Sequence, residues 1–199
     1  MVYSKVVERK FRRPTSQKSI VRKLGNPDIE WSVTYSSVYK ITNDSKLRIF
    51  QYKILNNCLF LNMNLFQFKK IESPNCAFCK SQIETLEHFF IDCSYSRNYY
   101  ISIKNWLEKG HIYLPKLNME NVILGGEGNN LEKFLFLLYK YTLYTARGQC
   151  QSPTLKQYQK KLIQYENLEH IIAKKNCKLL IHLQKYEKIR NIIEDLKKD

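Results

Sequence analysis

Hydrophobic residues recur at steps of three and four along much of this chain, the spacing that gives a helix one buried face. The pattern is clearest after Asp44, at positions Leu47, Phe50, Ile54, Cys58 and Leu61. Asp44 stands where an N-cap residue stands, so we expect a helix to begin there. Because Cys58 falls on the apolar face, we expect it to be a core residue.

Two further segments show the same pattern. One has its apolar face at Tyr95, Tyr99, Ile103, Trp106 and Leu107. Gly110 is its expected end. The other is the run FLFLLYKYTLY, residues 134–144, which contains Lys140 and follows the loop sequence GGEGNN. It predicts a buried helix, since it is too short and too charged to span a membrane.

The C-terminal segment from Leu155 to Leu196 is strongly helical in pattern. Its apolar positions lie near a seven-residue repeat, which Glu169, Asn176 and Arg190 interrupt. We predict one long helix or two shorter ones packed on the rest of the protein, with a coiled coil as the alternative. No segment shows a clear alternation of apolar and polar residues, so we expect no strands, with one short hairpin near the cysteines as the alternative. The sequence therefore predicts a mostly α fold.

The charge of the chain narrows the class of partner. Of 199 residues, 44% are hydrophobic, which is enough for a core, and the formal net charge is +15 with a pI near 9.5. A surface this basic favours a polyanionic partner, RNA or DNA, with an anionic membrane surface as the alternative. Basic residues are dense in residues 1–27, where Arg9, Lys10, Arg12 and Arg13 are candidate phosphate ligands. This arm is either a solvated tail or a phosphate-binding segment.

The cysteines point to a metal. The N-terminus has no secretory signal pattern, so we expect a nuclear or cytoplasmic protein whose cysteines are reduced. Cys76, Cys79, His88 and Cys93 follow the spacing Cys-x2-Cys-x8-His-x4-Cys. If TLEHFFIDC is a helix capped by Thr85, His88 and Cys93 lie about one turn apart. Three sulfurs and one imidazole suit one structural Zn²⁺ with no open position.

A thioredoxin-like dithiol at Cys76 and Cys79 is the competing interpretation of the cysteines. It requires a preceding strand and a βαβ setting, whereas the neighbouring patterns are helical. The other histidines, His111, His170 and His182, are scattered, and we assign them no role.

Aromatic and basic residues alternate around the four candidate ligands, a pattern typical of nucleic-acid binding. The rings are Phe66, Phe68, Phe78, Phe89, Phe90, Tyr95, Tyr99 and Tyr100. Most are expected to pack beneath the zinc loop. The better candidates for nucleic-acid contact are Lys69, Lys70, Lys80 and Arg97.

The order of these parts resembles the zinc-binding segment at the C-terminal end of reverse transcriptases from non-LTR (LINE-type) retrotransposons. The resemblance rests on DSKLRIFQYKILNN, NLFQFKKIESPNCAFC, ETLEHFFIDC, Trp106 and LEKFLFLLYKYTLY, and it covers roughly residues 31–160. It implies Cys76, Cys79, His88 and Cys93 as zinc ligands. It also implies a module that holds RNA or target DNA during target-primed reverse transcription, with the polymerase portion as a further partner.

No paired-aspartate polymerase motif and no endonuclease constellation occurs in the sequence, so we expect a non-catalytic chain. The expected parts are a flexible basic arm (residues 1–30), a helix with the zinc module (31–110) and a helical C-terminal region (111–199). The alternative function is a zinc-stabilised scaffolding domain that binds another protein. No membrane association is expected.

Overall fold

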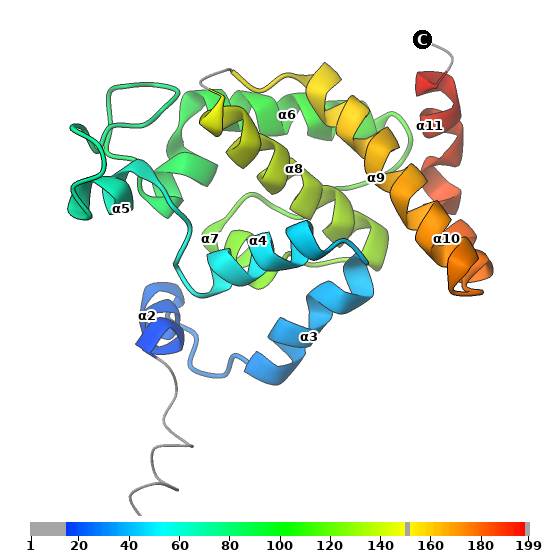
Figure 1. The fold of residues 1–199 in the computed structure, drawn as a ribbon, viewed down its shortest axis with the longest axis horizontal. Helices are drawn as coiled ribbons and strands as arrows, with labels where there is room; N and C mark the ends of the chain where they lie inside the picture. The colour runs from blue at the N-terminus through cyan, green and yellow to red at the C-terminus, as the bar shows by residue number, and fades with distance from the viewer. Residues whose placement is uncertain (1–14, 150–151, 198–199) are drawn as a thin grey trace, which may run out of the picture.

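The computed structural model describes residues 15–149 and 152–197, and this part of the chain is mostly helical, as predicted (Figure 1). The helical elements are α2 (Thr15–Leu24), α3 (Trp31–Ile41), α4 (Ser45–Leu55), α5 (Asn62–Gln67), η1 (His88–Asp92), α6 (Ser94–Glu108), α7 (Met119–Leu124), α8 (Asn130–Gly148), α9 (Leu155–Lys175), α10 (Leu179–Tyr186), η2 (Glu187–Ile189) and α11 (Arg190–Leu196). Within the described residues, extended pairing is limited to one antiparallel bridge between Asn75 and Ile83.

Helix α8 crosses the middle of the molecule, and α3, α4, α6, α9 and α10 all pack against it (Figure 1). It begins with a capping box, in which the Asn129 side chain accepts from the Glu132 N–H and Glu132 accepts from the Asn129 N–H. The predicted buried run lies in this helix, and Phe134, Leu135 and Leu138 are fully buried. The prediction of a buried helix is thus confirmed.

A buried lysine links three helices in the core. Lys140 of α8 donates from Nζ to Gln51 Oε1 of α4 at 2.7 Å and to the Val122 carbonyl of α7 at 2.9 Å. Gln51 in turn donates to the Ile123 carbonyl at 2.7 Å. Burial lowers the pKa of Lys140 to about 7, because the charged ammonium is poorly solvated there.

Helix α4 begins as predicted but ends earlier. The Asp44 side chain accepts from the Leu47 N–H at 2.9 Å, which confirms the N-cap. The helix ends at Leu55, and Asn57 takes a left-handed backbone conformation with φ of 51°. Asparagine tolerates this conformation better than most residues. The prediction that Cys58 is a core residue is wrong, because this turn leaves Cys58 exposed.

The N-terminal segment differs in part from the expected arm. Residues from Thr15 onward form α2, whose Ile20 is buried and whose Lys23 lies 3.5 Å from Glu87. Packed structure therefore begins earlier than the basic composition suggests. The candidate phosphate ligands Arg9, Lys10, Arg12 and Arg13 lie outside the described residues.

The C-terminal region contains the predicted long helix, α9, followed by α10, η2 and α11. The break after α9 occurs where Asn176 caps the helix and Cys177 has a φ of 55°. These helices pack on one another and on α8 and lie together on one side of the molecule (Figure 1). None of the helices in the described ranges combines the length and the apolarity needed to cross a bilayer.

Candidate metal centre

The loop between α5 and η1 carries the first two candidate ligands. The bridge at Asn75 and Ile83 closes this loop, and the Cys76 N–H donates to the Gln82 carbonyl at 2.7 Å. Between the two cysteines the chain turns back, so that the Lys80 N–H donates to the Cys76 carbonyl at 3.0 Å. Lys80 adopts a left-handed conformation with φ of 59° to complete this turn. The Cys-x2-Cys spacing thus folds into a tight turn that presents both sulfurs to one side.

The other two candidate ligands come from the helical segment that follows. The Thr85 side chain accepts from the His88 N–H at 3.0 Å, as predicted for an N-cap. The Cys93 N–H donates to the His88 carbonyl at 2.8 Å, five residues back, which is π-type bonding. In an α-helix, residues five apart point about 140° away from each other. The wider π turn brings His88 and Cys93 toward one side, so their spacing becomes suitable for a shared ion.

The four candidate ligand atoms are close enough to share one metal ion. Cys76 Sγ lies 3.8 Å from Cys93 Sγ, and Cys79 Sγ lies 3.3 Å from His88 Nε2. All four atoms lie within 4.8 Å of one another. Zinc–sulfur bonds of about 2.3 Å in a tetrahedron put two sulfurs about 3.8 Å apart. The donor set and its geometry therefore fit a closed tetrahedral zinc site.

Electrostatics favour the thiolate, the form that binds zinc, at Cys93 and Cys79 but not at Cys76. The hydrogen bond between Cys76 and Cys93 lowers the pKa of Cys93 to about 5 and raises the pKa of Cys76. Two backbone N–H groups in the first turn of α6 also donate to Cys93 and lower its pKa. Burial alone would raise the pKa of Cys79, but hydrogen bonds from Ser81 and neighbouring groups lower it to about 7.

The second ring nitrogen of His88 is unusual. Nδ1 is buried, and within the described part of the chain it has no hydrogen-bond partner. Metal-bound histidines generally donate this N–H to a carboxylate, carbonyl or water. The orientation of the His88 ring therefore depends on the packing around it and on the contact between Nε2 and Cys79 Sγ.

A buried carboxylate fixes the zinc loop to the body of the protein. Glu84 accepts from the Ala77 N–H at 2.7 Å and from the Asn62 N–H at 2.8 Å. Its charge is paired with Arg147 near the end of α8, and Arg147 also donates to the Asn62 side chain. Sequence reasoning missed this role, since Glu84 and Arg147 lie 63 residues apart.

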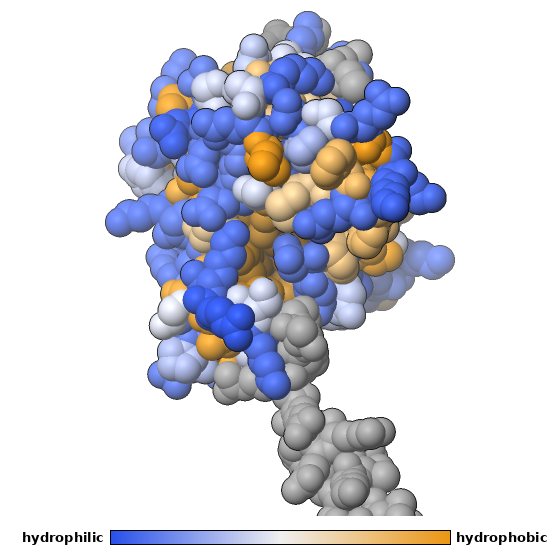
Figure 2. Space-filling model, turned by 90° about the vertical axis from the view of Figure 1, so that its left-hand side faces the viewer, coloured by the Kyte–Doolittle hydropathy of each residue, from blue (hydrophilic) through white to orange (hydrophobic). Residues whose placement is uncertain are grey.

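The aromatic residues divide into two groups. Phe89, Phe90, Tyr99 and Tyr100 are buried, and Phe89 stacks on Phe78 with ring centroids 5.8 Å apart. The remaining three, Phe66, Phe68 and Tyr95, are exposed by 44%, 61% and 46%. The predicted contacts Lys69, Lys70, Lys80 and Arg97 are all exposed. They belong to residues 62–97, called the zinc-binding lobe below. This segment lies on the side of the molecule that Figure 2 shows, whose surface is mainly hydrophilic with separate hydrophobic patches.

These features define a helical domain with one compact Cys₃His site. Residues 17–99 match the family model described as zinc-binding in reverse transcriptase. The matched segment runs from α2 into α6 and includes all four candidate ligands, which supports a zinc-binding region associated with reverse transcriptases. Such a region is not itself a catalytic domain. No curated protein and no solved structure matches the chain.

Proposed function

We propose that this chain is a non-catalytic nucleic-acid-binding module of a LINE-type reverse transcriptase, held in shape by one structural Zn²⁺. It would hold RNA or target DNA during target-primed reverse transcription. The observation that carries the proposal is the Cys₃His cluster within a segment that matches reverse-transcriptase zinc-binding regions. The net charge of +15 supports a polyanionic partner.

The proposed contact surface is the zinc-binding lobe. Lys69 and Lys70 follow α5, Lys80 follows the second cysteine, and Arg97 lies in the first turns of α6. Their exposure leaves them able to neutralise phosphates and release counterions. Phe66 and Phe68 precede Lys69 and Lys70 within a few residues of the sequence, and their exposed rings offer faces on which bases can stack.

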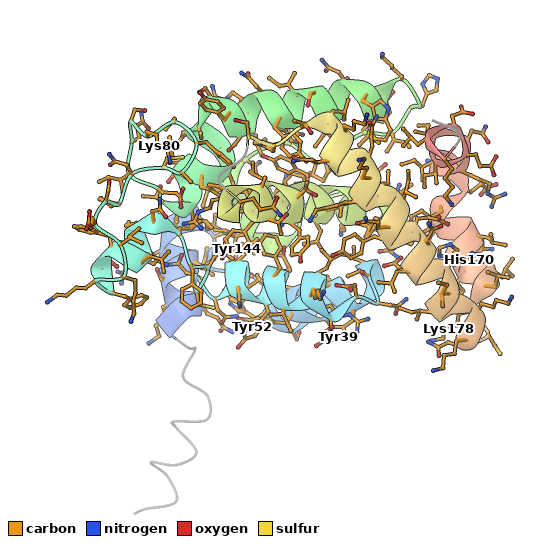
Figure 3. The ribbon with its side chains drawn as sticks, turned by 45° about the horizontal axis from the view of Figure 1, so that its top comes forward. Tyr39, Tyr52, Lys80, Tyr144, His170 and Lys178 are labelled. Atoms are coloured by element: carbon orange, nitrogen blue, oxygen red, sulfur yellow. The ribbon has the colours of Figure 1, made fainter. Side chains whose placement is uncertain are left out.

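The binding test compares two variants with equal loss of charge. In the first, Lys69, Lys70, Lys80 and Arg97 are replaced by Gln. In the matched control, the exposed residues Lys174, Lys175, Lys178 and Lys188 are replaced by Gln. Lys178 lies at the opposite end of the molecule from Lys80 (Figure 3).

We expect the first variant to bind single-stranded RNA more weakly than the control in filter-binding titrations. Its plot of log affinity against log salt should be shallower by about 0.7 for each phosphate that the variant no longer neutralises. Equal losses of affinity in both variants would contradict the proposed surface. No binding by the unaltered chain at low salt would refute the nucleic-acid function.

Zinc is tested separately on the purified chain. Cys79→Ser removes a ligand, so we expect loss of the structural zinc in elemental analysis and a broader unfolding transition, because metal binding and folding are coupled. Cys58→Ser is the matched control, since Cys58 is exposed and lies outside the cluster. Equal zinc content in both variants would contradict the site.

A scaffolding role is the second candidate function, with the polymerase portion as the partner. It is favoured by large apolar side chains exposed on α9 and α10, Ile171 at 64%, Leu180 at 68% and Ile181 at 63%. Under this alternative, the chain would form concentration-dependent assemblies in sedimentation experiments, and added RNA would not change them.

A further inference from the structure

A second cluster of metal-ligand side chains lies at the end of the molecule opposite Lys80, where Figure 3 labels His170. Glu166 and His170 stand four residues apart on α9, which places them on one helix face. His182 comes from α10, which packs against α9. One ligand atom from each of the three side chains lies within 4.8 Å of the others. The group has no recognisable spacing in the sequence, because the break between α9 and α10 separates His182 from Glu166 and His170.

One distance within the cluster, between a hydrogen-bonded nitrogen and oxygen, is also compatible with a shared ion of the size of zinc. His182 Nε2 lies 3.3 Å from Glu166 Oε1. Zinc bonds of about 2.0–2.2 Å to nitrogen and oxygen place two tetrahedral ligand atoms about 3.4 Å apart. The His170 and His182 rings meet edge to face, with centroids 5.2 Å apart and planes at 74°. Their nitrogens can therefore turn toward a common point without stacking against each other.

A lysine holds the other oxygen of the carboxylate. Lys197 Nζ donates to Glu166 Oε2 at 2.9 Å and to the Asn167 side chain at 3.0 Å. This contact orients Glu166 and leaves Oε1 facing His182, in the way that outer hydrogen bonds orient metal ligands. It also places a positive charge nearby, so binding here should be weaker than at the thiolate site.

The cluster combines burial with access from solvent. His182 is 6% exposed, whereas Glu166 and His170 are half-buried. The three side chains border a hollow of about 310 Å³ between α9, α10 and α11. An ion here would keep a side open to water, unlike the closed Cys₃His site.

We propose that Glu166, His170 and His182 form a second metal site, of the His₂Glu type, for a divalent transition-metal ion such as Zn²⁺. Two imidazoles and one carboxylate are a donor set that zinc uses in proteins, with a fourth position left for water. The ion would join α9 to α10 across their break and so stabilise the C-terminal helices. This site does not depend on the nucleic-acid function proposed above.

The experiment titrates Zn²⁺ into the full chain with its Cys₃His site already loaded, by equilibrium dialysis. We expect a second equivalent that a mild chelator removes while the first remains. His170→Ala and Glu166→Gln should each weaken this second binding at least tenfold, since loss of an outer partner alone costs about 10–100-fold. Both residues are half-buried, so circular dichroism should show retained folding.

Two comparisons make the result specific. His111→Asn is the control for surface histidines, because His111 is exposed and Asn tolerates its left-handed backbone with φ of 56°. It should bind as the unaltered chain does. Co²⁺ in the second site should give a spectrum without thiolate charge-transfer bands. A chain that binds one equivalent only, or variants that bind as the unaltered chain does, would overturn the proposal.

Discussion

At the scale of single residues, Glu84 shows how the zinc-binding lobe is joined to the rest of the protein. Its carboxylate is fully buried, and its partners come from the zinc loop, from α5 and from α8. A buried charge of this kind is tolerated only when it is paired and fully hydrogen-bonded. Glu84 is not a candidate ligand; it holds the loop that carries Cys76 and Cys79 against the body of the protein.

Glu84→Gln is expected to destabilise the protein strongly. The change leaves the Arg147 guanidinium without its charged partner, and breaking a buried pair costs about 3–5 kcal/mol. Urea unfolding measures the loss. Glu87→Gln is the matched control, because Glu87 pairs with Lys23 at the surface, where such pairs contribute about 0–1 kcal/mol. Similar losses in the two variants would show that Glu84 has no special structural role.

At the scale of elements, the π turn of η1 brings the last two candidate ligands, His88 and Cys93, toward a common point. The bond from the Cys93 N–H to the His88 carbonyl spans five residues and ends where α6 begins. Cys93 thus lies at the start of α6, where the backbone N–H groups stabilise its thiolate. The junction of η1 and α6 therefore determines both where the Cys93 side chain points and how readily its thiol ionises.

Insertion of one alanine between Asp92 and Cys93 should abolish zinc binding. Residues six apart in an α-helix point about 120° away from each other, so Cys93 would turn away from His88. Elemental analysis and a competition assay with a colorimetric chelator measure the loss. Asp92→Ala keeps the spacing and should bind zinc normally. Retained zinc in the insertion variant would mean that the turn does not control the ligand geometry.

Local patterns predicted the elements that depend on neighbouring residues. The N-cap at Asp44, the cap at Thr85 and the buried run of α8 all follow from spacings within a few residues. The early end of α4, which exposes Cys58, depended on the left-handed conformation of Asn57. The pairing of Glu84 with Arg147 and the meeting of His170 with His182 depend on tertiary packing, which no local period encodes.

At the scale of the whole molecule, the core contains a lysine, Lys140, whose protonation depends on pH near neutrality. Lys140 is fully buried, and its pKa of about 7 lies well below that of an unfolded lysine, about 10.4. Between these values the unfolded chain binds more protons than the folded one. The free energy of unfolding should therefore rise with pH in this window.

Comparison with Lys140→Met isolates this effect. Between pH 7 and pH 9 we expect the unaltered chain to gain about 1–3 kcal/mol relative to this variant, since one pKa unit corresponds to about 1.4 kcal/mol. Urea unfolding at the two pH values measures the difference. Lys156→Met is the control for an exposed lysine and should follow the unaltered chain. A constant difference between the unaltered chain and Lys140→Met would contradict the low pKa.

The ion pair between Glu84 and Arg147 has a practical consequence for the boundaries of the zinc-binding segment. The family match ends at residue 99, but the guanidinium that neutralises Glu84 belongs to α8, well beyond that point. Helices α3, α4 and α6 also bury their apolar faces against α8. A fragment cut at the limits of the match would keep all four candidate metal ligands and still lack the partner of its buried carboxylate. We therefore expect the smallest autonomous folding unit to be longer than the matched segment.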